Sequence, residues 1–375
     1  MKTITLAGPH IVRDDSPYLN SSREIAGYKF IIDPSLIGPN GFPTGQMGRP
    51  FGTPDWLTAW GLLTIPPGSR NIRIVDCEFE GPWDDILAIP EGLPGHPSWL
   101  CGIDMYYANG IQIEGCNFER LPRFGISFTA CSGVDIRDVW GRNCVNLIHA
   151  DYVGTPRNRF ISIKRVQSVD GWQALPMPKN AFWASGYDPR RGIGSNAVSG
   201  WFADSTISQI TTSGEAKAAL KLVNPIRVKV DRSEIISLMQ QGTMYFDTIG
   251  DRGAYNSSKF DASLGAAARD VEFTRCTFRL DQSAWPNTRQ RRCLQLSYPQ
   301  TDVRFRDCRF YRDDRPNSPG LQIWEGAECD IRDSVFVGWE SATDGWLYQL
   351  GDYGRPGSVK GKINADLATA NRFQL

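Results

Sequence analysis

The sequence predicts an all-β protein, a parallel β-helix (solenoid) of about ten coils. Three observations lead to this prediction. A short phrase of alternating apolar residues recurs along the chain, a second apolar segment precedes each copy, and the spacing between copies has a lower limit. Repetition at periods of roughly 20–50 residues is the sequence signature of a solenoid.

The recurring phrase alternates apolar and polar residues and then changes step. In the first copy, Ile72 and Ile74 alternate with polar residues, and a two-residue step leads to Cys77. Period-two alternation predicts a strand with one buried face. The extra residue before the cysteine indicates a bend where the strand turns a corner. The clearest copies are Asn71–Phe79, Gly110–Phe118, Asp270–Phe278 and Asp302–Phe310, and Cys329–Phe336 is a degenerate one with Ser334 in the cysteine place.

Weaker copies and a second set of strands complete the coils. The shortest interval between phrases, from Ile111 to Val134, is 23 residues and predicts the length of a bare coil, with longer intervals holding inserted loops. Weaker copies begin at Val134, Ile161, Ser205 and Val228, with a ragged one at Val359–Ile363. The second strands are expected at Leu62–Ile65, Gly102–Met105, Gly125–Phe128, Val145–Ile148, Ala219–Leu222, Met244–Asp247, Cys293–Leu296, Gly320–Ile323 and Trp346–Gln349.

This pattern resembles the right-handed, single-stranded parallel β-helix superfamily, the pectin-lyase-like proteins, over residues 55–365. The resemblance implies a right-handed coil and is greatest to the β-helix proteins of bacteriophage tailspikes and virions. The superfamily also contains polysaccharide lyases, hydrolases and epimerases, so the fold leaves the function open. The signature segments of pectate lyases, polygalacturonases and alginate epimerases do not occur in this sequence.

Three regions are expected along the chain. Residues 1–54 do not repeat, apart from two candidate strands at Thr3–Leu6 and Tyr28–Ile32, and are expected to form a cap or an arm that attaches to another protein. Residues 55–365 form the β-helix, and residues 366–375 form a short C-terminal cap. The longest insertions all follow the phrase, so we expect them to line one flank of the solenoid.

Composition limits the classes of function. The 375 residues carry a formal net charge of zero, which argues against a nucleic-acid-binding surface. No run of 18 apolar residues is present, so no membrane span is expected. Five of the nine cysteines lie in the phrase and no Cys-x-x-Cys pair occurs, which predicts buried thiols and neither a metal site nor another cofactor.

Tryptophan is the second unusual feature, with 12 residues, six of them in or beside the long insertions. Aromatic faces on an elongated groove suit sugar rings, which have apolar faces and hydroxyl rims. The alternative is that these side chains anchor the loops to the solenoid. The candidate ligand-binding residues are Trp83, Trp99, Trp172, Trp183, Trp285 and Trp339.

Two places have residue types suited to catalysis. The acidic pairs in the loops include Asp313, and glycoside hydrolysis needs two carboxyl groups. On the other edge, Tyr106, His149 and Asp151 are expected to be neighbours on stacked coils. His149, oriented by Asp151 and aided by Tyr106 as a proton donor, suits a lyase or epimerase. A turn histidine that only makes hydrogen bonds is the alternative.

These observations favour a structural protein of a bacteriophage virion: a tailspike-like spike or a capsid-decoration protein. We expect a homotrimer that attaches to other virion proteins through residues 1–54 and presents its loops to host surface polysaccharide. The apolar stretch at the N-terminus is too short for the secretory signal we expect of an exported enzyme, which agrees either with a mature secreted chain that begins with a new Met or with release by lysis in a virion. The alternative is an extracellular polysaccharide lyase or hydrolase, and a third reading is a non-catalytic adhesin.

Overall fold

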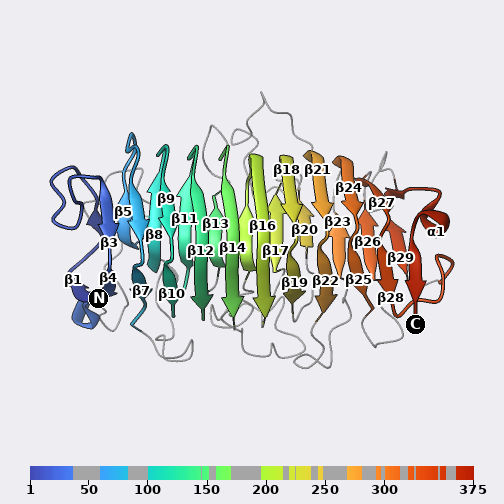
Figure 1. Ribbon diagram of the computed structural model, residues 1–375, viewed down its shortest axis with the longest axis horizontal. Coiled ribbons are helices and arrows are strands. Elements are labelled where there is room, and N and C mark those ends of the chain that lie inside the picture. The colour runs from blue at the N-terminus through green and yellow to red at the C-terminus, as the bar shows by residue number, and fades with distance from the viewer. Residues whose placement is uncertain are drawn as a thin grey trace, which may run out of the picture.

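In the computed structural model, the chain is a parallel β-helix whose coils stack along one axis from the N-terminus to the C-terminus (Figure 1). The structure describes residues 1–36, 60–82, 100–144, 146–151, 158–169, 196–213, 219–223, 225–237, 244–247, 268–280, 293–296, 300–312, 320–324, 327–344, 347–351 and 360–375. Within them every strand pairing is parallel and joins consecutive coils, which confirms the predicted fold class. None of the helices found there is long and apolar enough to cross a membrane.

An 11-stranded sheet, here called sheet B, forms one wall of the solenoid. It contains the second strands predicted from the sequence. Its strands, in spatial order, are β2 (His10–Ile11), β5 (Trp60–Ile65), β8 (Leu100–Tyr106), β11 (Phe124–Thr129), β13 (Asn146–Ala150), β15 (Asn196–Gly200), β17 (Leu220–Val223), β20 (Met244–Asp247), β23 (Leu294–Leu296), β26 (Leu321–Trp324) and β29 (Tyr348–Gly351).

A 20-stranded sheet, here called sheet A, is built from the recurring phrase and has two ladders. The first contains β3 (Glu24–Ala26), β6 (Arg73–Val75), β9 (Gln112–Glu114), β12 (Asp135–Arg142), β14 (Ser162–Val169), β16 (Ala203–Ser213), β18 (Ile226–Asp231), β21 (Ala268–Thr274), β24 (Gln300–Arg306), β27 (Ala327–Arg332) and β30 (Lys362–Ile363). The second contains β1 (Lys2–Leu6), β4 (Tyr28–Ile32), β7 (Glu78–Glu80), β10 (Asn117–Glu119), β19 (Glu234–Ser237), β22 (Thr277–Leu280), β25 (Arg309–Tyr311), β28 (Val335–Val337) and β31 (Arg372–Gln374). The long strands β12, β14 and β16 run through both ladders.

The predicted bend lies between the two ladders. The residue before the cysteine place has a positive φ in coil after coil, for example 49° at Asp76 and 52° at Asp307. The bend tilts backbone carbonyl groups toward the thiol, and Cys308 Sγ lies 3.4 Å from the carbonyl oxygen of Arg306. Ser334 takes the same place in the next coil, and its hydroxyl donates to the carbonyl of Arg332 at 2.9 Å. The cysteines are therefore weak hydrogen-bond donors at a corner as well as compact core residues.

The core is one continuous cluster inside the solenoid. The last residue of the phrase stacks on its counterpart in the next coil, and the ring centroids of Phe79 and Phe118 are 4.9 Å apart. A second stack near the C-terminus runs through Phe278, Phe310 and Phe336. All nine cysteines are buried free thiols, as the sequence predicted.

The two chain ends continue the solenoid. Strands β1, β2, β3 and β4 pair in register with strands of the following coils, so residues 1–36 extend both sheets. Strands β1 and β4 match the strands predicted at Thr3–Leu6 and Tyr28–Ile32, whereas β2 and β3 were not predicted because these coils carry no cysteine phrase. The boundary predicted at residue 54 lies outside the described residues. A one-turn 3₁₀ helix (Pro34–Leu36) follows β4, and α1 (Leu367–Ala370) precedes the last strand, whose Phe373 stacks on Phe336.

Candidate functional site

A row of polar side chains crosses the outer face of sheet B. Because the strands are parallel and in register, one residue from each of six consecutive strands lies beside the next. The alternating neighbours, such as Ile103 and Ile126, point into the core. We call this set the sheet B row; its members are Thr64, Asp104, Ser127, His149, Ser199 and Lys221.

Asp104 is a buried carboxyl group in this row, with 1% of its surface exposed. The Tyr106 hydroxyl donates a hydrogen bond to Asp104 Oδ2, and Ser127 also hydrogen-bonds to this carboxyl group. Burial removes water from the carboxylate and raises the pKa of Asp104 to about 7, although both hydrogen bonds act in the opposite direction. Asp104 therefore holds a proton under conditions in which an ordinary aspartate has lost it.

His149 lies two strands from Asp104 in the same row. Its ring stacks on Phe124 with centroids 4.2 Å apart and an interplanar angle of 15°. Its Nδ1 atom is 2.8 Å from the Ser199 hydroxyl oxygen. Burial is the main cause that lowers the pKa of His149 to about 3, so the imidazole is neutral at physiological pH.

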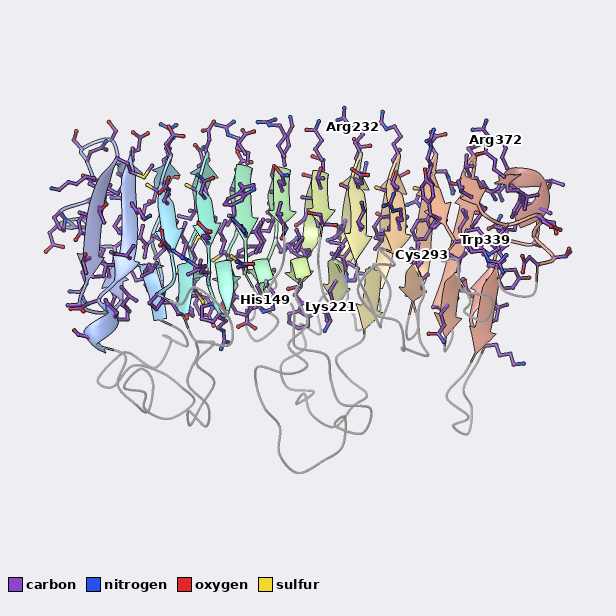
Figure 2. The ribbon with its side chains drawn as sticks, turned by 90° about the horizontal axis from the view of Figure 1, so that it is seen from below. His149, Lys221, Arg232, Cys293, Trp339 and Arg372 are labelled. Carbon is purple, nitrogen blue, oxygen red and sulfur yellow. The ribbon has the colours of Figure 1, made fainter. Side chains whose placement is uncertain are left out.

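Charged side chains surround these two groups. The Arg123 guanidinium lies over the Phe124 ring, 4.9 Å from its centroid. Arg123 and Lys221 both disfavour a positive charge on His149 and so lower its pKa further. Asp151 raises the pKa of Asp104 through charge repulsion, whereas Arg123 lowers it. Figure 2 shows His149 and Lys221 along one side of the solenoid, with Arg232 of sheet A on the opposite side.

The outer face of sheet A is different, because its charges neutralise one another between coils. Asp204 pairs with Arg159 at 2.9 Å and also with Arg227. Arg306 pairs with Asp330 at 2.5 Å. These pairs protect a regular, partly exposed sheet surface, and each contributes little to stability. Among the described residues no group of three metal-ligating side chains is placed to hold an ion.

The structure places Tyr106 and His149 on strands of sheet B that are two coils apart, and Asp151 directly follows the strand of His149. Tyr106 pairs with Thr129 in the sheet, as expected, and its hydroxyl binds Asp104. The Nδ1 atom of His149 contacts Ser199, where the sequence suggested orientation by Asp151. A group with a pKa of about 3 is a weak base, so this geometry makes Asp104 a better candidate for proton transfer than His149. Asp313 lies outside the described residues.

One of the six candidate tryptophans lies in the described part of the chain. Trp339 is completely buried and packs edge-to-face on Phe336, with ring centroids 6.0 Å apart. This position corresponds to the anchoring alternative, because a buried ring offers no face to a ligand. The others, Trp83, Trp99, Trp172, Trp183 and Trp285, lie outside the described residues.

Sequence reasoning missed the role of Asp104 and its neighbours, although the signal was present. Asp104, Ser127 and Lys221 occupy outward positions of the predicted second strands. Aligning the second strands by their inward residues Ile103, Ile126 and Ile148 puts Asp104, Ser127 and His149 in one row. The alignment does not show which residues are buried, and burial shifts the pKa values of Asp104 and His149.

No protein-family model matches this sequence, and no curated protein matches it. Solved structures match this chain at low sequence identity. The catalytic domain of a GH87 α-1,3-glucanase in complex with nigerose matches 99% of this chain and 63% of its own, with 9% identity and a TM-score of 0.51. A variant of that domain in complex with tetrasaccharides matches 98% of this chain with a TM-score of 0.50 and 9% identity. The Dettilon tailspike protein matches 99% of this chain and 61% of its own, with 10% identity and a TM-score of 0.43. This chain thus spans 63% of the length of the glucanase chains, and the similarity to them shows a shared right-handed parallel β-helix fold.

Proposed function

We propose that this protein binds an extended polysaccharide along the outer face of sheet B and hydrolyses its glycosidic bonds. The observation that carries the proposal is the pair of desolvated titratable groups in one row, Asp104 and His149, whose pKa values burial moves in opposite directions. Groups perturbed in this way concentrate at functional sites. The similarity to a glucanase catalytic domain agrees with the proposal at the level of the fold.

Asp104 is the proposed general acid. A carboxyl group with a pKa of about 7 keeps its proton until the glycosidic oxygen needs it. The proton passes from Asp104 to the leaving-group oxygen as the bond from that oxygen to the anomeric carbon breaks. A water molecule forms the new bond to the anomeric carbon and gives its proton to the Asp151 carboxylate. The products are a new reducing end and a new non-reducing end.

The two carboxyl groups stand on different coils, and direct attack by a water molecule held by Asp151 would invert the anomeric carbon. Asp151 lies two coils and two strand positions from Asp104, which separates the Cα atoms by roughly 12 Å. Both side chains lie on the outer side of the sheet, because Ala150 between His149 and Asp151 is in the core. Inverting enzymes hold their carboxyl groups about 6.5–9.5 Å apart to admit a water molecule, and retaining enzymes about 5 Å apart.

His149 is proposed to position the sugar and not to transfer a proton. The neutral imidazole stacks on Phe124 and lies 2.8 Å from the Ser199 hydroxyl, so its ring is held in one orientation in the row. The cations Arg123 and Lys221 on the two sides of His149 suit a polysaccharide that carries carboxylate groups. The substrate class we propose is therefore an acidic polysaccharide.

A second candidate is the function that the sequence favoured: a spike of a bacteriophage virion that binds host polysaccharide without cleaving it. The burial of Asp104, Tyr106 and His149 favours this candidate, because nearly inaccessible side chains also suit a structural network. The virion location, the homotrimer and attachment through residues 1–54 belong to this proposal. A gene position between tail genes and a lysis cassette would support it.

One experiment separates the two candidates. The purified protein is incubated with polygalacturonate, alginate and α-1,3-glucan, and reducing ends and unsaturated products are measured. Hydrolysis predicts reducing ends without unsaturated products, activity lost in Asp104→Asn, and activity kept in the control Asp138→Asn on the outer face of sheet A. Binding without any product would support the non-catalytic spike. Unsaturated products would identify a lyase and exclude the roles proposed for Asp104 and Asp151.

A further inference from the structure

Two large aromatic side chains are exposed on the turn that leads from sheet B to sheet A. Tyr107 directly follows β8 and has 45% of its surface exposed, and Phe160 precedes β14 with 57% exposed. Among the described residues, the other exposed large hydrophobic side chains are those at the chain ends, Met1 and Leu375. Within the described ranges, exposed rings in the body of the chain are thus confined to this turn.

Both residues have a backbone conformation that bulky side chains rarely adopt. The φ angle is 47° at Tyr107 and 55° at Phe160. A left-handed conformation costs a residue with a Cβ atom roughly 1–2 kcal/mol, and such strain is retained where a function requires it. A positive φ recurs in the same places on neighbouring coils, which have Ala130 beside Tyr107, and Gly133 and Asp204 on the two sides of Phe160.

Isolated β-bridges along the turn show which residues of neighbouring coils occupy equivalent positions. Single parallel bridges join Asn109 to Ser132 and Ser132 to Arg159, so the residue after each one lies in a common row. With the bridges from Arg70 to Asn109 and from Arg159 to Ala203, that row reads Asn71, Gly110, Gly133, Phe160 and Asp204. A Cβ atom on Gly133 would meet nothing closer than the Gly110 backbone nitrogen at 3.5 Å, so the surface between the two rings is open and formed by backbone.

Polar groups border the rings. The Arg159 guanidinium lies over the Phe160 ring, 5.2 Å from its centroid, and is held by Asp204 at 2.9 Å. Asn109 is exposed, and Ser132 is partly exposed. Tyr107 and Phe160 stand two coils apart, which is about 10 Å along the solenoid axis. The turn thus offers two separate aromatic faces, a flat floor between them, and hydrogen-bonding side chains alongside.

We propose that this turn is a sugar-binding subsite, with one pyranose ring on Tyr107, another on Phe160, and their hydroxyl groups bonded to Asn109, Ser132 and Arg159. Sugar rings pair apolar C–H faces with polar rims, and the turn pairs aromatic faces with polar side chains in the same way. A protein partner would need a contiguous apolar centre, which two isolated rings do not provide. The inference takes its ligand class from the proposed function and adds a contact surface outside the sheet B row.

The strain gives this proposal an unusual test. Tyr107→Gly and Phe160→Gly remove a ring and relieve a strained backbone at the same time. Each should raise the melting temperature by about 1–2 °C. Each should also weaken retardation in gels that contain polygalacturonate, alginate or α-1,3-glucan by about threefold or more, the contribution of one stacked ring. Asp307→Gly is the control, because Asp307 has φ 52° on a bend of sheet A and should gain stability with unchanged retardation.

Several results would overturn the proposal. Retardation unchanged in both ring variants would show that the rings contact no sugar, and a lower melting temperature would show that they are structural. A changed oligomeric state in Tyr107→Gly would make the turn an interface between copies of the chain. Absence of retardation by all three polysaccharides would also overturn it. If retardation depends on the rings but no product is released, this subsite stands and the hydrolysis proposal fails.

Discussion

Replacing Asp104 by Asn should change how the stability of the protein depends on pH. Asp104 has a folded-state pKa of about 7, against an ordinary value of 3.8. Between these values the unfolded chain has lost this proton and the folded chain keeps it. The stability contributed by Asp104 is therefore fully present below pH 3.8 and is lost as the pH rises to 7. Asn at this position does not titrate, so the stability of the variant does not fall in this way as the pH rises.

The size of the change in stability follows from the shift in the pKa of Asp104. Each pH unit between the two pKa values changes the free energy of unfolding by about 1.4 kcal/mol, so the interval from pH 5 to pH 7 accounts for about 3 kcal/mol. For 375 residues the unfolding entropy is about 0.8 kcal/mol/K. The melting temperature of Asp104→Asn relative to the wild type should thus rise by about 3 °C between pH 5 and pH 8.

The assay is thermal unfolding of both proteins at pH 5, 6, 7 and 8 with a matched scan rate. His149 provides an internal comparison of opposite sign, because its folded-state pKa is lowered from 6.5 to about 3. Its contribution is present above pH 6.5 and is lost on acidification, so His149→Gln should gain relative stability at pH 5. In the wild type the two effects nearly offset each other. A constant difference between Asp104→Asn and the wild type at all four pH values would show that Asp104 titrates normally, and would remove it as general acid.

Three further predictions concern the scaffold. Phe310→Ala interrupts an aromatic stack with neighbours at 5.1 and 5.0 Å and should lower stability by about 3–5 kcal/mol, measured by thermal unfolding; Phe310→Leu should cost clearly less. Cys308→Ser should cost less than about 1 kcal/mol because Ser334 fills this place in the next coil, and a loss equal to that of Cys308→Ala would contradict the donor role. Burial raises the pKa of Cys131 and Cys293 to about 12, so a thiol reagent should label these thiols only after unfolding, and fast labelling of the native protein would refute their burial.

The repeat determined the fold from sequence because it records contacts that every coil shares. Period-two alternation before Cys77 predicted a strand, and the two-residue step predicted the bend that φ 49° at Asp76 confirms. Strands β2, β3 and β15 (Asn196–Gly200) were missed. These segments lack the phrase, and their apolar residues gain strand structure only by pairing with coils that already have it.

The site was harder to predict, because its chemistry depends on burial. The sequence singled out His149, Tyr106 and Asp151, which lie on or beside the outer face of sheet B. It did not single out Asp104, whose local sequence is ordinary. Its raised pKa arises from desolvation and, to a smaller extent, from the charge of Asp151, which is distant in the chain.

The exposed turn illustrates the same division. Alternating residues and turn signals predict where the chain bends, but whether Tyr107 and Phe160 are exposed, and whether their φ is positive, depends on how consecutive coils align. The sequence alone determined the parallel β-helix and its buried thiols, because the alternation of apolar and polar residues along a strand decides which side of the strand each residue occupies. Only the tertiary structure decided which outward residues meet and which of them lose contact with water, because distances between coils and burial are properties of the stacked solenoid.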